Sequence, residues 1–168
     1  MDLLKLMKDE SETLHFREEE FGFMVEFNKD IVNQMLNLCE NSFPNETGGI
    51  LIGKYSIDNS SALIKKITPA PKDSEHKRFS FVRGVAGLES ILNKEWKKGR
   101  YYLGEWHYHP SASSYPSQKD KNQMLKISQD IDIKCPEPIL IIIGGNKENW
   151  TINVSMYIKN KQLFLNEK

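Results

Sequence analysis

The sequence has no long hydrophobic run and no excess of either charge. Its longest uninterrupted apolar segment, 139–143, is far shorter than the roughly 20 residues that a membrane-spanning helix needs. Lys and Arg together number 23, as do Asp and Glu, so the formal net charge is zero. Such a balance provides no overall positive field for nucleic acid or for an anionic membrane. We therefore expect no nucleic-acid partner and no membrane partner.

Cysteine is also scarce, because Cys39 and Cys135 are the only two in 168 residues. They form no CxxC pair, and two cysteines in a chain of this length are not a disulfide framework. We expect each to be a buried apolar residue rather than a ligand, a nucleophile or a redox switch. Residues 1–10 have neither an unbroken apolar stretch nor a small-residue cleavage site, so no signal peptide is expected. This pattern favours a cytoplasmic protein.

Length and composition indicate one globular domain. Hydrophobic residues make up 39% of the chain and charged residues 27%, which is ordinary for a globular protein with a buried core. We expect residues 1–20 to be a charged leader, either a short helix or a mobile tail, that is exposed to solvent. Residues 21–168 are expected to form the domain itself.

Hydrophobic periodicity predicts an alternation of strands and helices after the leader. Strands are expected at 21–27, 50–55, 62–68, 79–82, 101–109, 138–143, 150–158 and 162–165. Helices are expected at 28–40, 85–98 and 117–130. The strand at 138–143 is continuously apolar, which indicates that both of its faces are covered. Together these elements predict an α/β domain in which helices flank both faces of one mixed β-sheet.

Two histidines lie two residues apart on the strand expected at 101–109. Because successive strand side chains point to opposite faces, His107 and His109 share one face. Trp106 and Tyr108 would point to the other face, into the packed interior. Both imidazoles can therefore reach one metal ion, although the spacing alone leaves a structural histidine pair equally open.

A serine and an aspartate follow a polar turn at 110–116, which can carry the chain back over the strand end. Ser117-x-x-Asp120 before an apolar helical stripe resembles a capping box, and capping is the interpretation that this segment favours by itself. The same cap would bring Asp120 beside the strand that carries the histidines. Two imidazoles and one carboxylate leave a fourth position open, which is the pattern of catalytic zinc.

Two glutamates are candidates for a carboxylate near such a metal. Glu46 precedes Gly48 and Gly49, whose missing side chains let another backbone come close. Glu105 has the same strand parity as the histidines and could support the site from behind. Either residue could equally be a solvated strand end.

Five side chains and their spacing resemble the JAMM motif of the JAB/MPN zinc metallopeptidases. These are Glu46, His107, His109, Ser117 and Asp120. Seven residues separate the second histidine from the serine, as in the motif. The resemblance covers about 23–158 and implies the JAB/MPN fold, which is similar to that of cytidine deaminases.

The resemblance also implies a role for each of these residues. His107, His109 and Asp120 would hold Zn²⁺. Glu46 would take a proton from water and later deliver it to the leaving amine. Ser117 would stabilise the oxyanion. The implied enzyme is a JAMM-type zinc metalloprotease that acts as a peptidase or isopeptidase.

A narrower resemblance is to the prokaryotic JAB branch of this family. It is carried by the segments 84–88, 102–110 and 135–138. That branch occurs in antiphage operons beside E1/E2-like conjugating enzymes, and it includes the deconjugating peptidases of type II CBASS operons. The implied partner is the C-terminal tail of a CD-NTase or of a ubiquitin-like protein, together with its conjugates. An extended tail suits strand addition, with 68–81 as one wall of its binding site.

A catalytically silent MPN-like interaction module is the alternative hypothesis. Such modules typically lack zinc ligands or the glutamate, and all of these residues are present here. A nucleobase deaminase would need the Pro-Cys-x-x-Cys and His-x-Glu signatures, which the sequence does not contain. Metal content is the measurement that separates an enzyme from a silent module.

Overall fold

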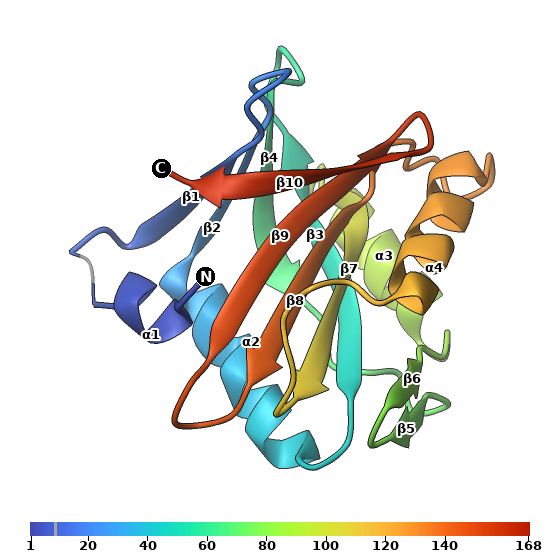
Figure 1. Ribbon diagram of the computed structural model, residues 1–168. Coiled ribbons are helices and arrows are strands. Elements are labelled where there is room, and N and C mark those ends of the chain that lie inside the picture. The colour runs from blue at the N-terminus through green and yellow to red at the C-terminus, as the bar shows by residue number, and fades with distance from the viewer. Residues whose placement is uncertain (9) are drawn as a thin grey trace.

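The fold is a mixed β-sheet that closes into a barrel (Figure 1). The computed structural model describes residues 1–8 and 10–168, so Asp9, which falls within the expected leader, lies outside the described residues. The strand order is β1-β10-β9-β8-β7-β3-β4-β2. The barrel strands are β1 (Thr13–Arg17), β2 (Met24–Asn28), β3 (Thr47–Tyr55), β4 (Ser61–Ile67), β7 (Tyr101–Pro110), β8 (Ile139–Gly145), β9 (Thr151–Ile158) and β10 (Lys161–Glu167).

The sheet is mixed because two of its strand pairs are parallel. β2 runs parallel to β4, and β7 runs parallel to β8, while the other neighbours are antiparallel. A separate antiparallel hairpin is formed by β5 (Glu75–Lys77) and β6 (Ser80–Val82). The helices are α1 (Leu3–Leu6), α2 (Lys29–Ser42), α3 (Leu88–Trp96) and α4 (Gln118–Gln129).

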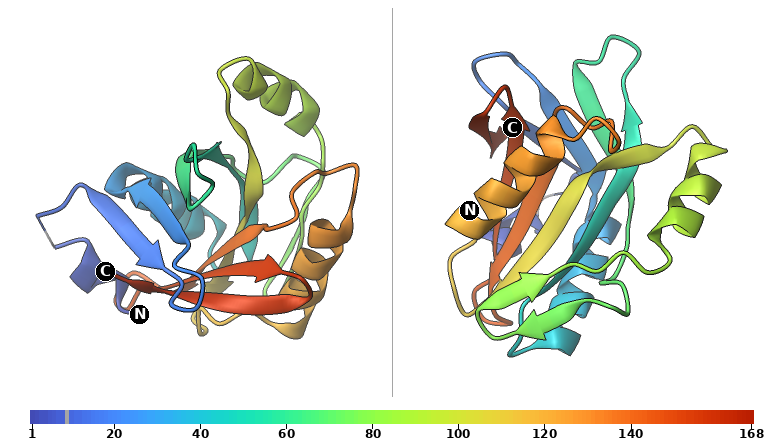
Figure 2. Two further views of the ribbon diagram at one scale, coloured as in Figure 1. Left: turned by 90° about the horizontal axis from the view of Figure 1, so that it is seen from above. Right: turned by 90° about the vertical axis from the view of Figure 1, so that its right-hand side faces the viewer.

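Helices cover both faces of the sheet, as the sequence predicted (Figure 2). On one face, α2 adds Ile31, Val32 and Met35 to the main core. On the other face, α3 packs through Leu88 on β3, and α4 packs through Met124 on β8 and β9. In the described part of the chain, none of the helices combines the length and apolar character needed to span a membrane.

β7 lies at the centre of this arrangement, between β3 and β8. Trp106 and Tyr108 are fully buried in the main core, which confirms that they point away from the histidine face. All seven residues of β8 are buried, so the prediction of a strand covered on both faces is also correct. Cys39 and Cys135 are buried free thiols.

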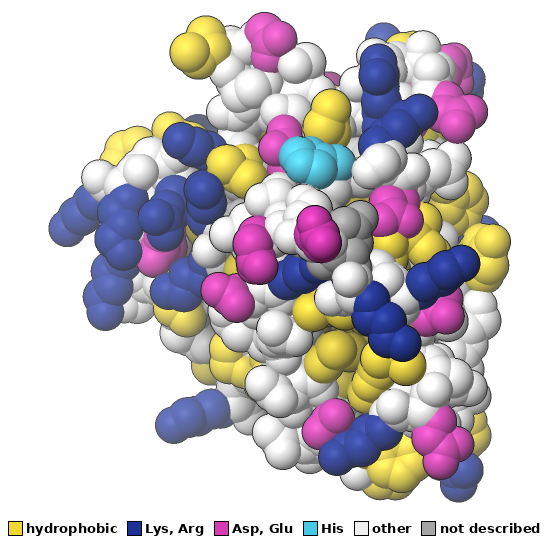
Figure 3. All heavy atoms as spheres, turned by 90° about the vertical axis from the view of Figure 1, so that its left-hand side faces the viewer, with side chains coloured by type: hydrophobic (Ala, Val, Ile, Leu, Met, Phe, Trp, Pro, Cys, Tyr) yellow, Lys and Arg dark blue, Asp and Glu magenta, His cyan; other side chains and the backbone are white. Residues whose placement is uncertain are grey.

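The expectation of a solvated leader is wrong. β1 pairs with β2 and with β10, so it closes the barrel. Leu14 and Phe16 of β1 are buried, and so is Leu3 of α1. The alternation of β1 is hard to recognise in the sequence because the strand has only five residues. Two of them are apolar and point inward, and they alternate with Thr, His and Arg. The face that carries α1 and β1 exposes charges of both signs (Figure 3).

Other element boundaries also differ from expectation, two of them for identifiable local reasons. The strand expected at 21–27 begins only at Met24, since the Glu18 carboxylate accepts the amides of Glu20 and Phe21 and turns the chain there. The helix expected at 85–98 is shortened to α3, because Gly87 takes a left-handed φ of 80° just before it. The strand β5 lies between the segments expected as strands at 62–68 and 79–82, where no strand was expected.

Replacing Phe16 with Ala should lower the free energy of unfolding by about 3–5 kcal/mol, because its fully buried ring stacks on Phe27. Phe21→Ala is the matched control, since that ring is 65% exposed and its loss should change stability by less than about 0.5 kcal/mol. Urea denaturation measures both. Equal effects of the two substitutions would contradict the assignment of β1 to the core.

Candidate metal centre

β7 brings two imidazoles to one face of the sheet near the end of the strand. His107 is 4% exposed and His109 is 9% exposed. The strand is held on one side by β3 and on the other by β8, where His107 pairs with Ile142 and His109 with Gly144. The sequence prediction that the two histidines share a face is therefore confirmed.

Close contact between β3 and β7 depends on a glycine. A Cβ atom at Gly48 would lie 2.3 Å from the backbone oxygen of Trp106 and 2.9 Å from the His107 ring. The Phe81 ring would also be 2.9 Å away. The missing side chain at Gly48 thus lets β3 and Phe81 of β6 pack directly on His107.

Asp120 reaches the histidines because a capping box fixes the start of α4. The Ser117 hydroxyl accepts the Asp120 amide at 3.2 Å, and the Asp120 carboxylate accepts the Ser117 amide at 2.7 Å. The predicted capping box is therefore present. Both partners of the cap are also predicted site residues, so capping and a place in the site are compatible.

The Asp120 carboxylate contacts both imidazoles. Its Oδ1 lies 2.9 Å from His107 Nδ1, and its Oδ2 lies 3.4 Å from His109 Nε2. The other nitrogen of His109, Nδ1, lies 3.1 Å from the carbonyl oxygen of Ser113. Since a carbonyl only accepts, His109 Nδ1 carries a proton, and Nε2 is the ring nitrogen that faces Asp120.

The donor set is suitable for zinc. Two ligand atoms that each lie about 2.0–2.1 Å from a tetrahedral zinc ion are about 3.3 Å apart, which is close to both contacts of Asp120. In this structure the imidazoles and the carboxylate are in direct contact with one another. Within the described residues, no three side chains of His, Cys, Asp or Glu are therefore spaced apart around a position for an ion. Two imidazole nitrogens and one carboxylate are nonetheless ligands that catalytic zinc accepts.

The carboxylates determine the protonation of the site. Burial lowers the pKa of His107, but hydrogen bonds to Asp120 and Glu105 outweigh it and raise the pKa to about 9. Burial also opposes ionisation of Asp120, yet His107 and His109 hold the pKa of that carboxyl well below its usual range. A protonated imidazole cannot bind metal, so a proton competes with an ion at His107.

Glu46 lies at the same site, just before β3, and is half-buried. The Glu46 amide donates to the Lys77 carbonyl at 2.9 Å, and the His76 ring contacts the Glu46 carbonyl at 3.0 Å. The β5–β6 hairpin therefore holds the backbone of Glu46. Burial raises the pKa of the Glu46 carboxyl, His109 opposes that shift, and Asp120 adds to it. A raised pKa brings a carboxylate closer to neutral pH, where it is a better proton acceptor.

A cleft of about 470 Å³ joins these groups. Four of the predicted site residues line it, namely Glu46, His109, Ser117 and Asp120. His107 lies behind them, with the Phe81 ring packed edge-on against it at 5.6 Å. The structure therefore brings all five predicted residues together. The β5–β6 hairpin forms one wall of the cleft, and the loop before α4 forms another.

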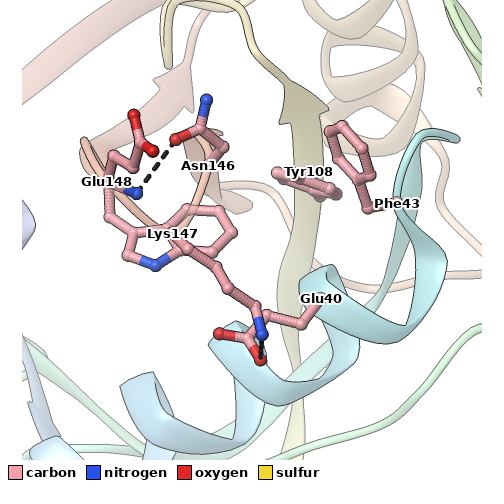
Figure 4. A pocket seen from close by; sticks show the side chains of 7 residues that line it. Glu40, Phe43, Tyr108, Asn146, Lys147 and Glu148 are labelled. Carbon is pink, nitrogen blue, oxygen red and sulfur yellow. Dashed lines mark hydrogen bonds and ion pairs between the residues drawn. The ribbon is translucent and has the colours of Figure 1, made fainter.

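A second cavity, of about 320 Å³, opens on the other face of β7 (Figure 4). Tyr108, the residue between the two histidines, lines it together with Trp150 and Phe43. An ion pair between Lys147 and Glu40 crosses it at 2.9 Å. None of its seven lining residues belongs to the predicted site. The alternation of side chains on β7 thus assigns its histidines and its tyrosine to different cavities.

Two alternatives were open for Glu105, a place near the site and a solvated strand end. The structure supports the first, because it buries Glu105 completely beside His107. Its partners Arg83 and Gln123 come from distant segments and show no sequence pattern that would have identified them. The same is true of Lys119, whose ammonium group bonds to Ser80 and to the Phe81 carbonyl.

Comparisons with known proteins identify the family of the chain. The chain matches the family described as prokaryotic homologs of the JAB domain over residues 28–156. It is 44% identical over 131 residues to a CD-NTase/cGAS isopeptidase of Enterobacter hormaechei subsp. hoffmannii, which covers 78% of this chain and 73% of that protein. It is 30% identical over 126 residues to the probable metalloprotease y4qB of Sinorhizobium fredii, covering 73% and 76% respectively.

A solved structure with a similar fold is that of protein DSY2949 from Desulfitobacterium hafniense. The TM-score is 0.61, and the match covers 84% of this chain and 88% of that one. The sequence identity is 20%, so this likeness supports the fold alone.

Replacing Ser117 with Ala should lower the free energy of unfolding by about 0.5–2 kcal/mol, because it removes the N-cap of α4. Ser128→Ala in the interior of the same helix is the control, and we expect it to change stability by less than about 0.5 kcal/mol. Urea denaturation compares the two. A Ser117 variant as stable as the Ser128 variant would show that the cap does not stabilise the helix start.

The stability of the metal-free protein should fall as the pH rises from about 6.5 to 9. Folding raises the pKa of His107 from 6.5 to about 9. The protonated ring therefore contributes fully to the free energy of unfolding below pH 6.5, and this contribution is lost as the pH rises through about 9. Urea denaturation in the presence of EDTA, at pH 6.5 and 9.5, measures the change. His107→Gln should flatten the profile over this interval, and an unaltered profile in that variant would contradict the assignment.

Proposed function

The chain belongs to the family of prokaryotic homologs of the JAB domain, and from this we propose that it is a zinc-dependent peptidase or isopeptidase that cleaves protein conjugates. The observation that carries the proposal is the meeting of Glu46 with two imidazoles, a serine and an aspartate around one cleft. A CD-NTase/cGAS isopeptidase is 44% identical to the chain, which supports the same class of reaction.

Zinc is the cofactor that the donor set suits. We assign His107, His109 and Asp120 as its ligands, with the fourth position open. When bound, zinc supplies Lewis acidity, which polarises a carbonyl and lowers the pKa of water from 15.7 to about 7. The two imidazoles contribute no charge and the carboxylate contributes one, so a positive charge remains for the reaction.

Glu46 is the proposed general base. Its carboxyl group is half-buried at the cleft wall, and burial raises its pKa. It would accept a proton from the attacking water and later donate that proton to the leaving amine. A well-placed acid–base group of this kind contributes about 10²–10⁴-fold to a rate.

Ser117 is the proposed oxyanion donor. Its side chain lines the cleft, and its position is set by the capping box with Asp120. The hydroxyl is held at the helix start, where it donates to Asp120 at 2.6 Å, and it would turn to the carbonyl oxygen as charge develops there. One such donor is worth about 3 kcal/mol of transition-state stabilisation.

The proposed substrate is an extended C-terminal tail that enters between the β5–β6 hairpin and the loop before α4. Phe79 and Tyr115 stand at the rim of this cleft and are 83% and 67% exposed, so they offer apolar surface to the tail. The relative's name favours the tail of a CD-NTase and its conjugates, and a ubiquitin-like tail is the second choice. In this scheme the enzyme reverses conjugation by cytoplasmic E1/E2-like enzymes in antiphage defence.

A non-catalytic interaction module is the less supported function. Such a module would not need Glu46, Ser117 and three possible metal ligands at one cleft. Their convergence favours catalysis.

Replacing Glu46 with Gln should lower turnover about 10²–10⁴-fold while the protein still binds about one zinc per chain, because the carboxyl group moves protons and is not a ligand. Cleavage of a model substrate with a CD-NTase tail fused to a second protein measures turnover. Atomic absorption measures zinc.

Glu148→Gln is the matched control, since Glu148 lines the cavity on the other face of β7 (Figure 4) and the change should leave turnover intact. A chelator should abolish cleavage by the wild type. Folded wild-type protein that takes up no zinc and cleaves neither tail would refute the proposed function.

A further inference from the structure

We infer that Glu105 is a positioning residue whose buried carboxylate fixes the ring of His107, so that its Nδ1 atom faces Asp120 and the metal. This inference rests on the proposed zinc site. Glu105 precedes His107 by two residues on β7, and its side chain is on the same face of the strand. Its side chain has no exposed surface.

The Glu105 carboxylate is surrounded by donors from three segments. Oε1 accepts Arg83 Nε at 2.8 Å and lies 3.4 Å from the Tyr102 hydroxyl. Oε2 accepts Gln123 Nε2 at 2.7 Å and lies 3.2 Å from His107 Nε2. A carboxylate buried to this degree is stable only when it is paired and hydrogen-bonded, and Arg83 provides the compensating charge.

The contact with His107 determines which ring nitrogen carries the proton. An ionised carboxylate can only accept, so the proton shared with Glu105 is on His107 Nε2. When the imidazole is neutral, its lone pair is then on Nδ1, which is the atom 2.9 Å from Asp120. Histidine ligands of metals commonly donate their other ring N–H to such a carboxylate, which orients the ring and raises its basicity.

The two histidines are oriented in different ways. His109 is held by the main-chain carbonyl of Ser113 at its Nδ1 atom and turns Nε2 to Asp120. His107 is held at Nε2 and turns Nδ1 to Asp120. Only the support of His107 is a side chain, so only that support can be removed by a substitution that leaves the backbone unchanged.

The same carboxylate connects the metal ligand to a wall of the cleft. Arg83 directly follows β6, and its guanidinium also donates to the Gly84 carbonyl at 2.8 Å. Gln123 comes from the middle of α4, one turn after Asp120. Glu105 therefore holds the hairpin segment, the capped helix and the histidine strand in one arrangement.

The chain contains a matched control for this role. Glu95 is also a buried glutamate, 2% exposed, and it pairs with Lys66, Lys98 and Arg100. It lies on α3, and within the described part of the chain its ion pairs involve neither His107 nor His109. Removing its charge tests what the loss of a buried ion pair does without touching the metal ligands.

Replacing Glu105 with Gln should weaken zinc binding about 10–100-fold, whereas Glu95→Gln should leave it unchanged. Competition with a chromophoric chelator measures the affinity, and circular dichroism checks that each variant is folded. In the cobalt-substituted protein, the visible absorption bands should shift for the Glu105 variant and not for the Glu95 variant. Equal zinc affinity and equal cobalt spectra for the wild type and Glu105→Gln would overturn the inference and reduce Glu105 to a structural ion pair.

A measurement on the wild type removes any dependence on the folding of the variant. In zinc-loaded protein labelled with ¹⁵N, the His107 ring should carry its proton on Nε2 and show the metal-bound shift on Nδ1. Coordination through Nε2 would overturn the inference while leaving the proposed enzyme intact. Wild-type protein that binds no zinc would overturn the proposed function, and this inference with it.

Discussion

The contact of Asp120 with two imidazoles is the interaction on which the site depends. One carboxylate closes the capping box of α4 and also lies 2.9 Å and 3.4 Å from the histidines of β7. The helix start and the strand end are therefore positioned by the same group. Both imidazoles stabilise the negative charge of Asp120, so its pKa is lowered and it stays ionised at pH values well below the ordinary pKa of an aspartate. The capping of α4 and the assembly of the candidate metal centre thus both depend on the Asp120 carboxylate.

Much of this site could be predicted from the sequence because its determinants are local. The period of two along β7 places His107 and His109 on one face, and the Ser117-x-x-Asp120 spacing fixes a cap. The contribution of Glu46 came from the resemblance to a family, since no local pattern links it to a strand some sixty residues later. The structure explains that link through Gly48, which lets β3 lie directly against β7.

What could not be predicted depends on contacts between distant segments. The partners of Glu105 come from the segment after β6 and from α4, and neither shows a periodic pattern. The β5–β6 hairpin has three-residue strands, too short for alternation to be visible. β1 was misjudged for a similar reason, since a five-residue strand with only Leu14 and Phe16 facing inward resembles a polar terminus. The mixed sheet and its two helical layers were predicted correctly, but not its closure into a barrel.

The pairing of β1 with β10 has a consequence for the order of events during synthesis. Phe16 lies opposite Glu167, so the first and last strands of the barrel meet across almost the whole chain. Closing such a long loop is slow and entropically costly. Until β10 leaves the ribosome, β1 and β9 each present an unpaired edge, and such edges invite association with other chains. Closure of the barrel therefore waits for β10, which follows the histidine strand β7 in the chain.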